Sequence, residues 1–105
     1  MIERVATHPG EVLREEFMIP LGLKASALSK AIGSTTQTVN ELARERRDVS
    51  PDMAIRLSKV FATTPAFWMN LQTAHNLSKQ FRANEDEYSQ ISELPHGPDA
   101  IVTGP

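Results

Sequence analysis

The sequence predicts an all-α fold of five helices followed by a C-terminal extension. No segment of the 105 residues alternates apolar and polar side chains over the length of a strand, whereas apolar residues recur at helical intervals. Proline stands at three expected helix starts, Pro9, Pro51 and Pro65, where its missing N–H is not needed. Gly22 and Gly33 fall where helices are expected to end.

The first helix is expected over residues 9–20 and the second over residues 24–32. Glu11 lies in the first turn of the first helix, where a negative charge complements the helix dipole. Gly33 follows the second helix and supplies the left-handed conformation that a tight turn needs. The apolar faces of these two helices are formed by Val12, Leu13 and Phe17 and by Ala25, Leu28 and Ile32.

The third helix is expected to open within residues 34–36, where a hydroxyl side chain can cap it, and to reach about Arg46. The fourth follows the cap residue Ser50, and the fifth follows Thr64 and ends near Ala83. Their apolar faces are formed by Val39, Leu42 and Ala43, by Met53, Ala54, Leu57, Val60 and Phe61, and by Phe67, Leu71, Ala74 and Phe81 with Trp68 beside them.

The length favours one folded unit, which we place at residues 1–83, with an acidic and then proline-rich extension over residues 84–105. The chain has no cysteine, so disulfides and thiolate metal sites are excluded. The N-terminus carries charges and no apolar run, and no stretch approaches the length of a membrane span. We therefore expect a cytoplasmic protein without a membrane partner.

The net charge of −2 conceals a segregation of charge along the chain. Residues 24–59 hold seven lysines and arginines against four acids, a net charge of +3, whereas the remaining residues hold four bases and nine acids. A local basic patch attracts phosphate whatever the total charge. The pattern is also compatible with a solvated surface of mixed charge, so it does not by itself assign a function.

The second helix, the turn at Gly33 and the third helix together form a predicted helix-turn-helix. Ser29 is small where the two helices must cross closely, and apolar residues on both sides fix their angle. This geometry would let the third helix enter the major groove of DNA while the second lies across the backbone. The unit that carries the function is thus expected between Ala25 and Arg47.

The outward face of the third helix carries the side chains that DNA contacts require. The amides of Gln37 and Asn40 can pair with adenine edges, and the threonines can reach phosphates or a thymine methyl. The arginines that follow can neutralise phosphates. A generic helical bundle with a solvated third helix is the alternative, but such helices usually carry Glu and Lys. The predicted DNA-binding residues are Thr35, Thr36, Gln37, Thr38, Asn40, Glu41, Arg44, Arg46 and Arg47.

Four segments between residues 8 and 72 resemble the HigA-type antitoxins, a group of helix-turn-helix proteins related to phage repressors. They are His8-Pro9-Gly10-Glu11, residues 28–42, residues 49–57 and Thr64-Pro65-Ala66-Phe67-Trp68-Met69-Asn70-Leu71-Gln72. The resemblance implies a phage-repressor-like fold and a homodimer that binds a palindromic operator upstream of its own gene pair. It also implies a partner toxin, a small basic mRNA endonuclease. The residues expected at the dimer interface are Phe67, Trp68, Leu71 and His75.

The chain departs from these relatives at the end of the third helix. Many of them have Asn-Gly where this chain has Arg44-Glu45. Because the helix-ending glycine is replaced, we expect the third helix to continue by about one further turn.

Three other functions are weighed against the antitoxin. The chain could be an orphan transcriptional regulator without a toxin, or a protein-interaction module that has lost DNA binding. An enzyme is the least favoured class, because no HExxH, phosphate-binding loop or nucleophile elbow is present. His8, His75 and His96 are scattered and have no accompanying ligand cluster, so no metal and no cofactor are expected.

Overall fold

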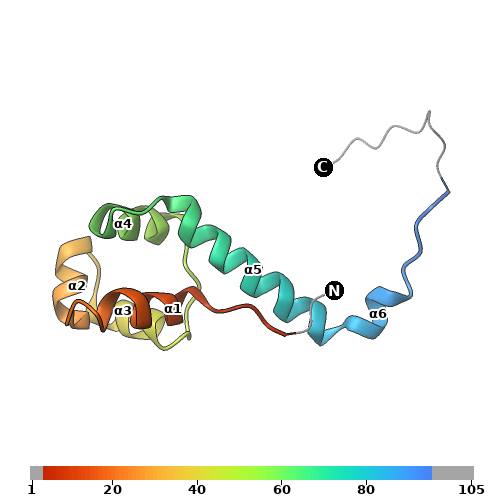
Figure 1. The fold of residues 1–105 in the computed structure, drawn as a ribbon, viewed down its shortest axis with the longest axis horizontal. Helices are drawn as coiled ribbons and strands as arrows, with labels where there is room; N and C mark the ends of the chain where they lie inside the picture. The colour runs from red at the N-terminus through yellow and green to blue at the C-terminus, as the bar shows by residue number, and fades with distance from the viewer. Residues whose placement is uncertain (1–3, 96–105) are drawn as a thin grey trace.

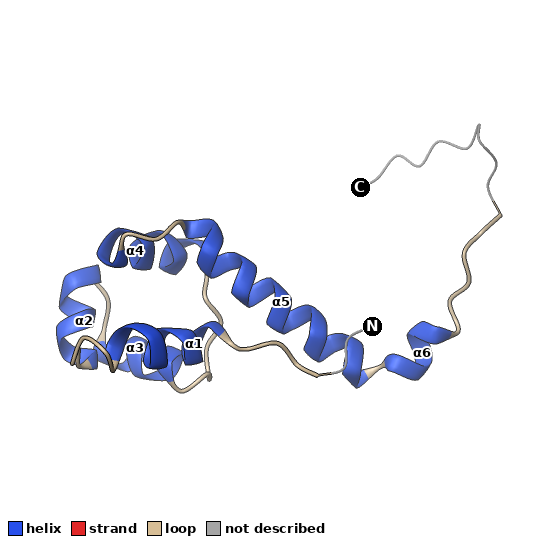
Figure 2. Ribbon diagram, in the orientation of Figure 1, coloured by secondary structure: helices blue, strands red, loops and turns tan. Residues whose placement is uncertain are grey.

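The computed structural model describes residues 4–95, and all regular structure within them is helical (Figures 1 and 2). The all-α prediction is confirmed. The elements are α1 (Pro9–Val12), the π-helix η1 (Leu13–Met18) that continues it, α2 (Ala25–Ile32), α3 (Thr36–Ala43), α4 (Pro51–Phe61), α5 (Pro65–Ala83) and α6 (Glu85–Ser89). The expected first helix is thus α1 together with η1. His96 and the rest of the proline-rich segment after Pro95 lie outside the described residues.

The helix starts follow the caps that the sequence predicts. The hydroxyl groups of Thr35, Ser50 and Thr64 accept hydrogen bonds from the N–H of Thr38, Met53 and Phe67, each at 3.1 Å. Each bond satisfies one of the amides that a helix leaves free at its N-terminus. The expected starts of α3, α4 and α5 are therefore confirmed.

His8 caps α1 with its ring. Nδ1 of His8 accepts a hydrogen bond from the N–H of Gly10 at 2.8 Å, and the side chain is buried against the ring of His75. Burial lowers the pKa of His8 below its ordinary value of 6.5, and the neighbouring His75 lowers it further. The cap is thus formed by a neutral imidazole.

Stability is expected to fall as the pH drops below about 6.5, because the unfolded chain then binds a proton that the folded His8 resists. The lowered pKa means that the contribution of His8 is present above pH 6.5 and is lost as the pH falls toward the folded value. His8→Asn keeps a capping side chain that does not titrate. Urea unfolding at pH 7.5 and 5.5 should show a smaller pH dependence for the variant. An equal dependence in both proteins would contradict this origin.

The prediction that the third helix reaches Arg46 is wrong. Helix α3 ends at Ala43, and Glu45 adopts a left-handed backbone with φ of 63°. The N–H of Arg46 bonds to the carbonyl of Glu41 at 2.8 Å, and the N–H of Glu45 bonds to that of Leu42 at 3.0 Å. This is the Schellman arrangement that normally places glycine at the left-handed position. The backbone therefore closes the helix here despite the glutamate.

The core centres on Trp68, whose side chain has no exposed surface. Its ring lies 5.4 Å from that of Phe17 and 6.4 Å from that of Phe61, and its Nε1–H donates to the hydroxyl of Thr63 at 2.8 Å. Of the residues expected on the apolar face of α5, Leu71 packs against the core, but Phe67 is 38% exposed and Ala74 is also exposed, so for these two the expectation is incorrect. The other buried apolar residues are Leu13, Met18, Leu28, Ile32, Val39, Leu42, Ala43, Val49, Met53, Ala54 and Leu57.

Helix α5 extends from the compact end of the molecule toward α6, and the N-terminal segment runs beside it (Figure 1). The hydroxyl of Ser78 accepts a hydrogen bond from the N–H of Ala6 at 2.8 Å. Nδ1 of His75 lies 2.8 Å from the carbonyl oxygen of Ala6. These two bonds hold the segment before α1 against α5.

None of the helices in residues 4–95 combines the length and the apolar character that crossing a bilayer requires.

Candidate nucleic-acid interface

Helices α2 and α3 are joined by a short turn that sets their crossing. Gly33 has φ of 69°, in the left-handed region that favours glycine. The hydroxyl of Ser29 is buried at the crossing, where it donates to the carbonyl of Ser26 and lies 3.2 Å from the hydroxyl of Thr36. A small side chain at position 29 therefore allows both close approach and a hydrogen bond between the helices.

Two arginines from other helices hold the C-terminal ends of this unit. Nη1 of Arg56, on α4, donates to the carbonyl of Ile32 at 2.7 Å at the end of α2. Arg14, on η1, donates to the carbonyl of Ala43 at the end of α3. A cation at a helix C-terminus satisfies a free carbonyl and complements the dipole. Sequence reasoning does not single out these positioning residues, because their partners are backbone groups 24 and 29 residues away.

Helix α1 approaches α3 directly at Gly10. A Cβ added to this buried residue would overlap the carbonyl oxygen of Leu42 and would lie 3.0 Å from Nδ1 of His8. Only a residue without a side chain fits between the two helices. The His8-Pro9-Gly10-Glu11 segment thus supports the back of α3, on the side away from its polar face.

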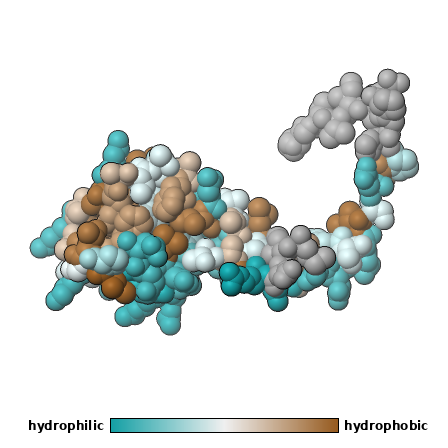
Figure 3. Space-filling view, in the orientation of Figure 1, coloured by the Kyte–Doolittle hydropathy of each residue, from teal (hydrophilic) through white to brown (hydrophobic). Residues whose placement is uncertain are grey.

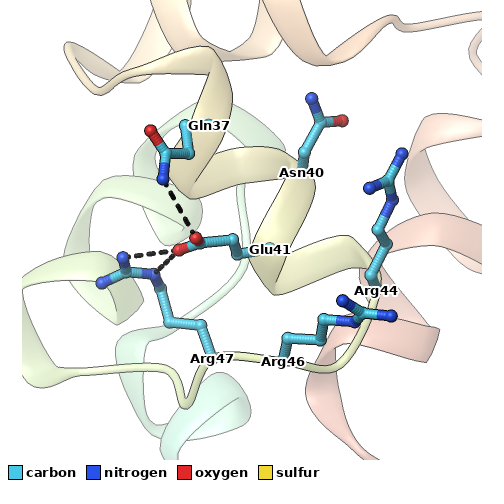
Figure 4. Close-up of a pocket in the computed structure, with 6 residues that line it drawn as sticks. All are labelled: Gln37, Asn40, Glu41, Arg44, Arg46 and Arg47. Atoms are coloured by element: carbon cyan, nitrogen blue, oxygen red, sulfur yellow. Dashed lines mark hydrogen bonds and ion pairs between the residues drawn. The ribbon is translucent and has the colours of Figure 1, made fainter.

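The outward face of α3 forms an open groove with the loop that follows it (Figure 4). Gln37 is exposed and Asn40 is half-buried on the helix. Arg44 and Arg46 are exposed, and their guanidinium groups make no hydrogen bond or ion pair within residues 4–95, so these groups are available to phosphates. The groove is lined by Gln37, Asn40, Glu41, Arg44, Arg46 and Arg47.

The three threonines predicted to bind DNA have structural partners in the free protein. Thr35 caps α3, and its hydroxyl also donates to that of Thr38 at 2.9 Å. The Thr36 hydroxyl faces Ser29 on α2. The structure thus brings the six predicted groove residues together and places the threonines at the start of the helix, beside the groove.

Glu41 lies at the centre of the groove and binds two of its neighbours. Its carboxylate accepts a hydrogen bond from Nε2 of Gln37 at 3.2 Å, and from Nε and Nη2 of Arg47 at 3.0 and 2.6 Å. The hydrogen bond from the Arg47 guanidinium, followed by that from Gln37, holds the pKa of the Glu41 carboxyl below its ordinary value of 4.5. The carboxylate is therefore charged at neutral pH.

The four residues expected at a dimer interface differ in accessibility. Trp68 is fully buried within its own chain and has no surface to offer a partner, because it fills the core between η1 and α4. Phe67 is exposed, and Leu71 and His75 are half-buried. On the face drawn in Figure 3, hydrophobic residues gather over the end of the molecule that holds α2 and α4.

The groove has the chemistry of a nucleic-acid contact. It combines amides, which can read base edges, with unpaired guanidinium groups. Within the part of the chain that the structure describes, no three histidine, aspartate or glutamate side chains converge as a metal site would require.

Comparison with known proteins agrees with this geometry. A helix-turn-helix family model matches residues 13–68. Virulence-associated protein I of Dichelobacter nodosus is 41% identical over 98 residues, which cover 93% of this chain and 88% of the relative. Pseudomonas aeruginosa antitoxin HigA, solved with the higBA promoter, superposes with a TM-score of 0.81 at 41% identity, covering 85% of this chain and 98% of that one. The antitoxin GraA in complex with its operator gives a TM-score of 0.81 at 48% identity, covering 87% and 93%.

Proposed function

The chain belongs to the helix-turn-helix family of DNA-binding regulators, in the group that contains the HigA and GraA antitoxins, and we propose that it represses its own operon as a homodimer and neutralises a cognate mRNA-cleaving toxin. In this proposal residues 1–83 bind DNA and form the dimer, and residues 84–105 form the extension. The protein would act in the cytoplasm beside its DNA, and the proposed function needs no catalytic step and no cofactor.

The observation that carries the proposal is the exposed polar face of α3 next to two unpaired arginines. In the proposal the amides of Gln37 and Asn40 read bases and the guanidinium groups of Arg44 and Arg46 bind phosphates; their shared position on the groove supports these roles. The helix is held from behind by Gly10 and at its end by Arg14. A rigid support of this kind favours sequence-specific binding over loose electrostatic attraction.

Exposed apolar side chains support the proposed homodimer. Phe67 and Leu77 on α5 are 38% and 63% exposed, and Ile55 on α4 is 49% exposed. A second copy related by a two-fold axis would cover such surface and place two α3 helices about 34 Å apart, one turn of DNA. We propose that Phe67, Leu71 and His75 contribute to this contact, without Trp68.

The C-terminal extension is the part of the chain that suits a basic toxin. Helix α6 begins with Glu85, Asp86 and Glu87, and Ile91 and Leu94 beyond it are 72% and 81% exposed. An acidic surface with exposed apolar groups complements a basic protein. A regulator without a toxin remains the alternative. Co-expression with the product of the adjacent gene, followed by co-purification and a translation assay, separates the two.

Replacing one base-reading residue and one phosphate-binding residue should have different effects. Gln37→Ala is expected to weaken binding to the upstream DNA by about 1–3 kcal/mol and to relax the preference over a scrambled duplex. Arg46→Ala is expected to weaken binding to both duplexes alike and to reduce the salt slope by about 0.9. Fluorescence anisotropy at two salt concentrations measures both quantities.

Wild-type protein and Lys79→Ala serve as references, because Lys79 lies on α5, outside the groove. If Gln37→Ala left both affinity and sequence preference unchanged, α3 would not be the reading helix. If the wild type bound neither duplex, the repressor function would fail as a whole.

A further inference from the structure

We propose that Glu41 is a specificity-determining residue that lowers binding to wrong DNA, by fixing the amide of Gln37 and by withholding Arg47 from phosphates. The inference rests on the proposed function and assigns a role to the acidic residue in a groove otherwise built for an anion. Without such a role, a carboxylate among three arginines would only repel the DNA backbone.

The geometry is specific to this carboxylate. One oxygen, Oε2, accepts from Nε2 of Gln37, and the other, Oε1, accepts twice from the guanidinium of Arg47. Figure 4 shows Arg47 turned back toward Glu41, whereas Arg44 and Arg46 lie at the other side of the groove. The neighbouring acid Glu45 instead accepts from Nη2 of Arg14 at 3.3 Å, and it makes no hydrogen bond or ion pair with Gln37 or Arg47.

The first consequence concerns the orientation of Gln37. Because its Nε2 is bound to Glu41, the amide cannot turn freely, and its oxygen faces away from the carboxylate (Figure 4). An amide that is already oriented loses less conformational entropy when it pairs with a base. It also cannot turn to suit a different base without breaking a charge-assisted bond.

The second consequence concerns Arg47. A phosphate must compete with Glu41 for this guanidinium, and a complex that captures Arg47 leaves the carboxylate without its charged partner. That loss is compensated only where the base facing Glu41 offers a hydrogen-bond donor, as the amino groups of cytosine and adenine do in the major groove. A guanine or thymine at this position presents only acceptors and leaves the carboxylate unpaired in the interface. Glu41 thereby acts against wrong sequences more than in favour of the right one.

The test measures binding of wild type, Glu41→Gln, Glu41→Ala and Glu45→Gln to the upstream duplex and to a scrambled duplex of equal composition. Fluorescence anisotropy is recorded at about 50 and 200 mM salt. Glu45→Gln is the matched control, because it removes the same charge from the turn after α3 and keeps a side-chain oxygen that can accept from Arg14. Glu45 has no hydrogen bond to Gln37 or Arg47 and does not line the groove. Circular dichroism verifies that each variant is folded.

Both Glu41 variants are expected to bind the scrambled duplex about tenfold more tightly, with a salt slope steeper by about 0.9 because the released Arg47 neutralises one more phosphate. Affinity for the upstream duplex should change by less than about threefold, so discrimination falls. Glu45→Gln should retain most of the discrimination. If the Glu41 variants kept wild-type discrimination and slope, or if Glu45→Gln lost as much discrimination, the inference would be overturned while the repressor function stood.

A measurement without DNA tests the positioning directly. The side-chain amide resonances of Gln37 in the free protein should move toward those of an exposed glutamine in Glu41→Ala and stay in place in Glu45→Gln. Unchanged Gln37 resonances in Glu41→Ala would overturn the inference even if the repressor function held. Equal binding of both duplexes by the wild type would instead remove the function and the inference together.

Discussion

Replacing Trp68 with alanine is expected to lower the free energy of unfolding by about 3–5 kcal/mol. The indole is fully buried and lies against Phe17 and Phe61, so its removal leaves a cavity between η1, α4 and α5. The change also removes the Nε1–H that donates a hydrogen bond to the hydroxyl of Thr63. Urea unfolding followed by circular dichroism should show a large decrease in the midpoint, or an unfolded protein.

The adjacent Phe67 gives a matched control, because it is an aromatic residue on the same helix with 38% of its surface exposed. Phe67→Ala is expected to cost about 1 kcal/mol in the free energy of unfolding, and its main effect should be on self-association. If both variants lost the same stability, the assignment of Trp68 to the core and Phe67 to the surface would be wrong. The pair therefore also tests which aromatic residue can contact a second copy.

The sequence predicts the helix starts well because their determinants are local. A capping hydroxyl acts on an amide three residues later, and proline acts on its own backbone, so Ser50-Pro51 and Thr64-Pro65 can be read without the tertiary fold. The turn at Gly33 is equally predictable from the sequence, since the left-handed backbone that separates α2 from α3 favours a glycine. These features suffice to predict the helix-turn-helix.

The end of α3 could not be predicted from such local preferences. Glu45 stands where glycine is usual, and nothing in its own chemistry favours a φ of 63°. The conformation is held by tertiary contacts, because Arg14 from η1 donates to both the carbonyl of Ala43 and the carboxylate of Glu45. Surrounding structure of this kind outweighs the intrinsic cost of the left-handed backbone.

The pairing of Glu41 with Arg47 depends on the same unpredicted turn. In a continuous helix, residues six apart lie about 240° around the axis from each other and cannot touch. Because α3 ends at Ala43 and the chain reverses at Glu45, Arg47 comes back beside Glu41. Sequence analysis places both residues in the DNA-binding set, but it gives no sign that one binds the other.

The inward face of α5 is predicted incorrectly for a different reason. Periodicity indicates an apolar stripe through Phe67 and Leu71 with Trp68 beside it, yet Phe67 is exposed and the fold buries Gln72 and Ser78 together with Trp68. Gln72 is buried because its Oε1 accepts a hydrogen bond from the N–H of Val49 at 2.6 Å. A hydrophobicity pattern cannot predict a polar residue that is buried because it binds a distant backbone amide.

Gly10→Ala is expected to lower the free energy of unfolding by about 3 kcal/mol and to weaken binding to the upstream DNA. A methyl group at position 10 would overlap the carbonyl of Leu42, so α1 must move away from α3 and disturb the support behind the DNA-facing groove. Gly22→Ala is the control, because Gly22 has φ of 61° and open space where its Cβ would lie. Gly22→Ala should lower the free energy of unfolding by only about 1 kcal/mol, because alanine disfavours a left-handed backbone, and it should bind DNA normally. If urea unfolding found Gly10→Ala to be no less stable than Gly22→Ala, the close approach of α1 to α3 would be contradicted, and with it the role of the His8–Glu11 segment in positioning the recognition helix.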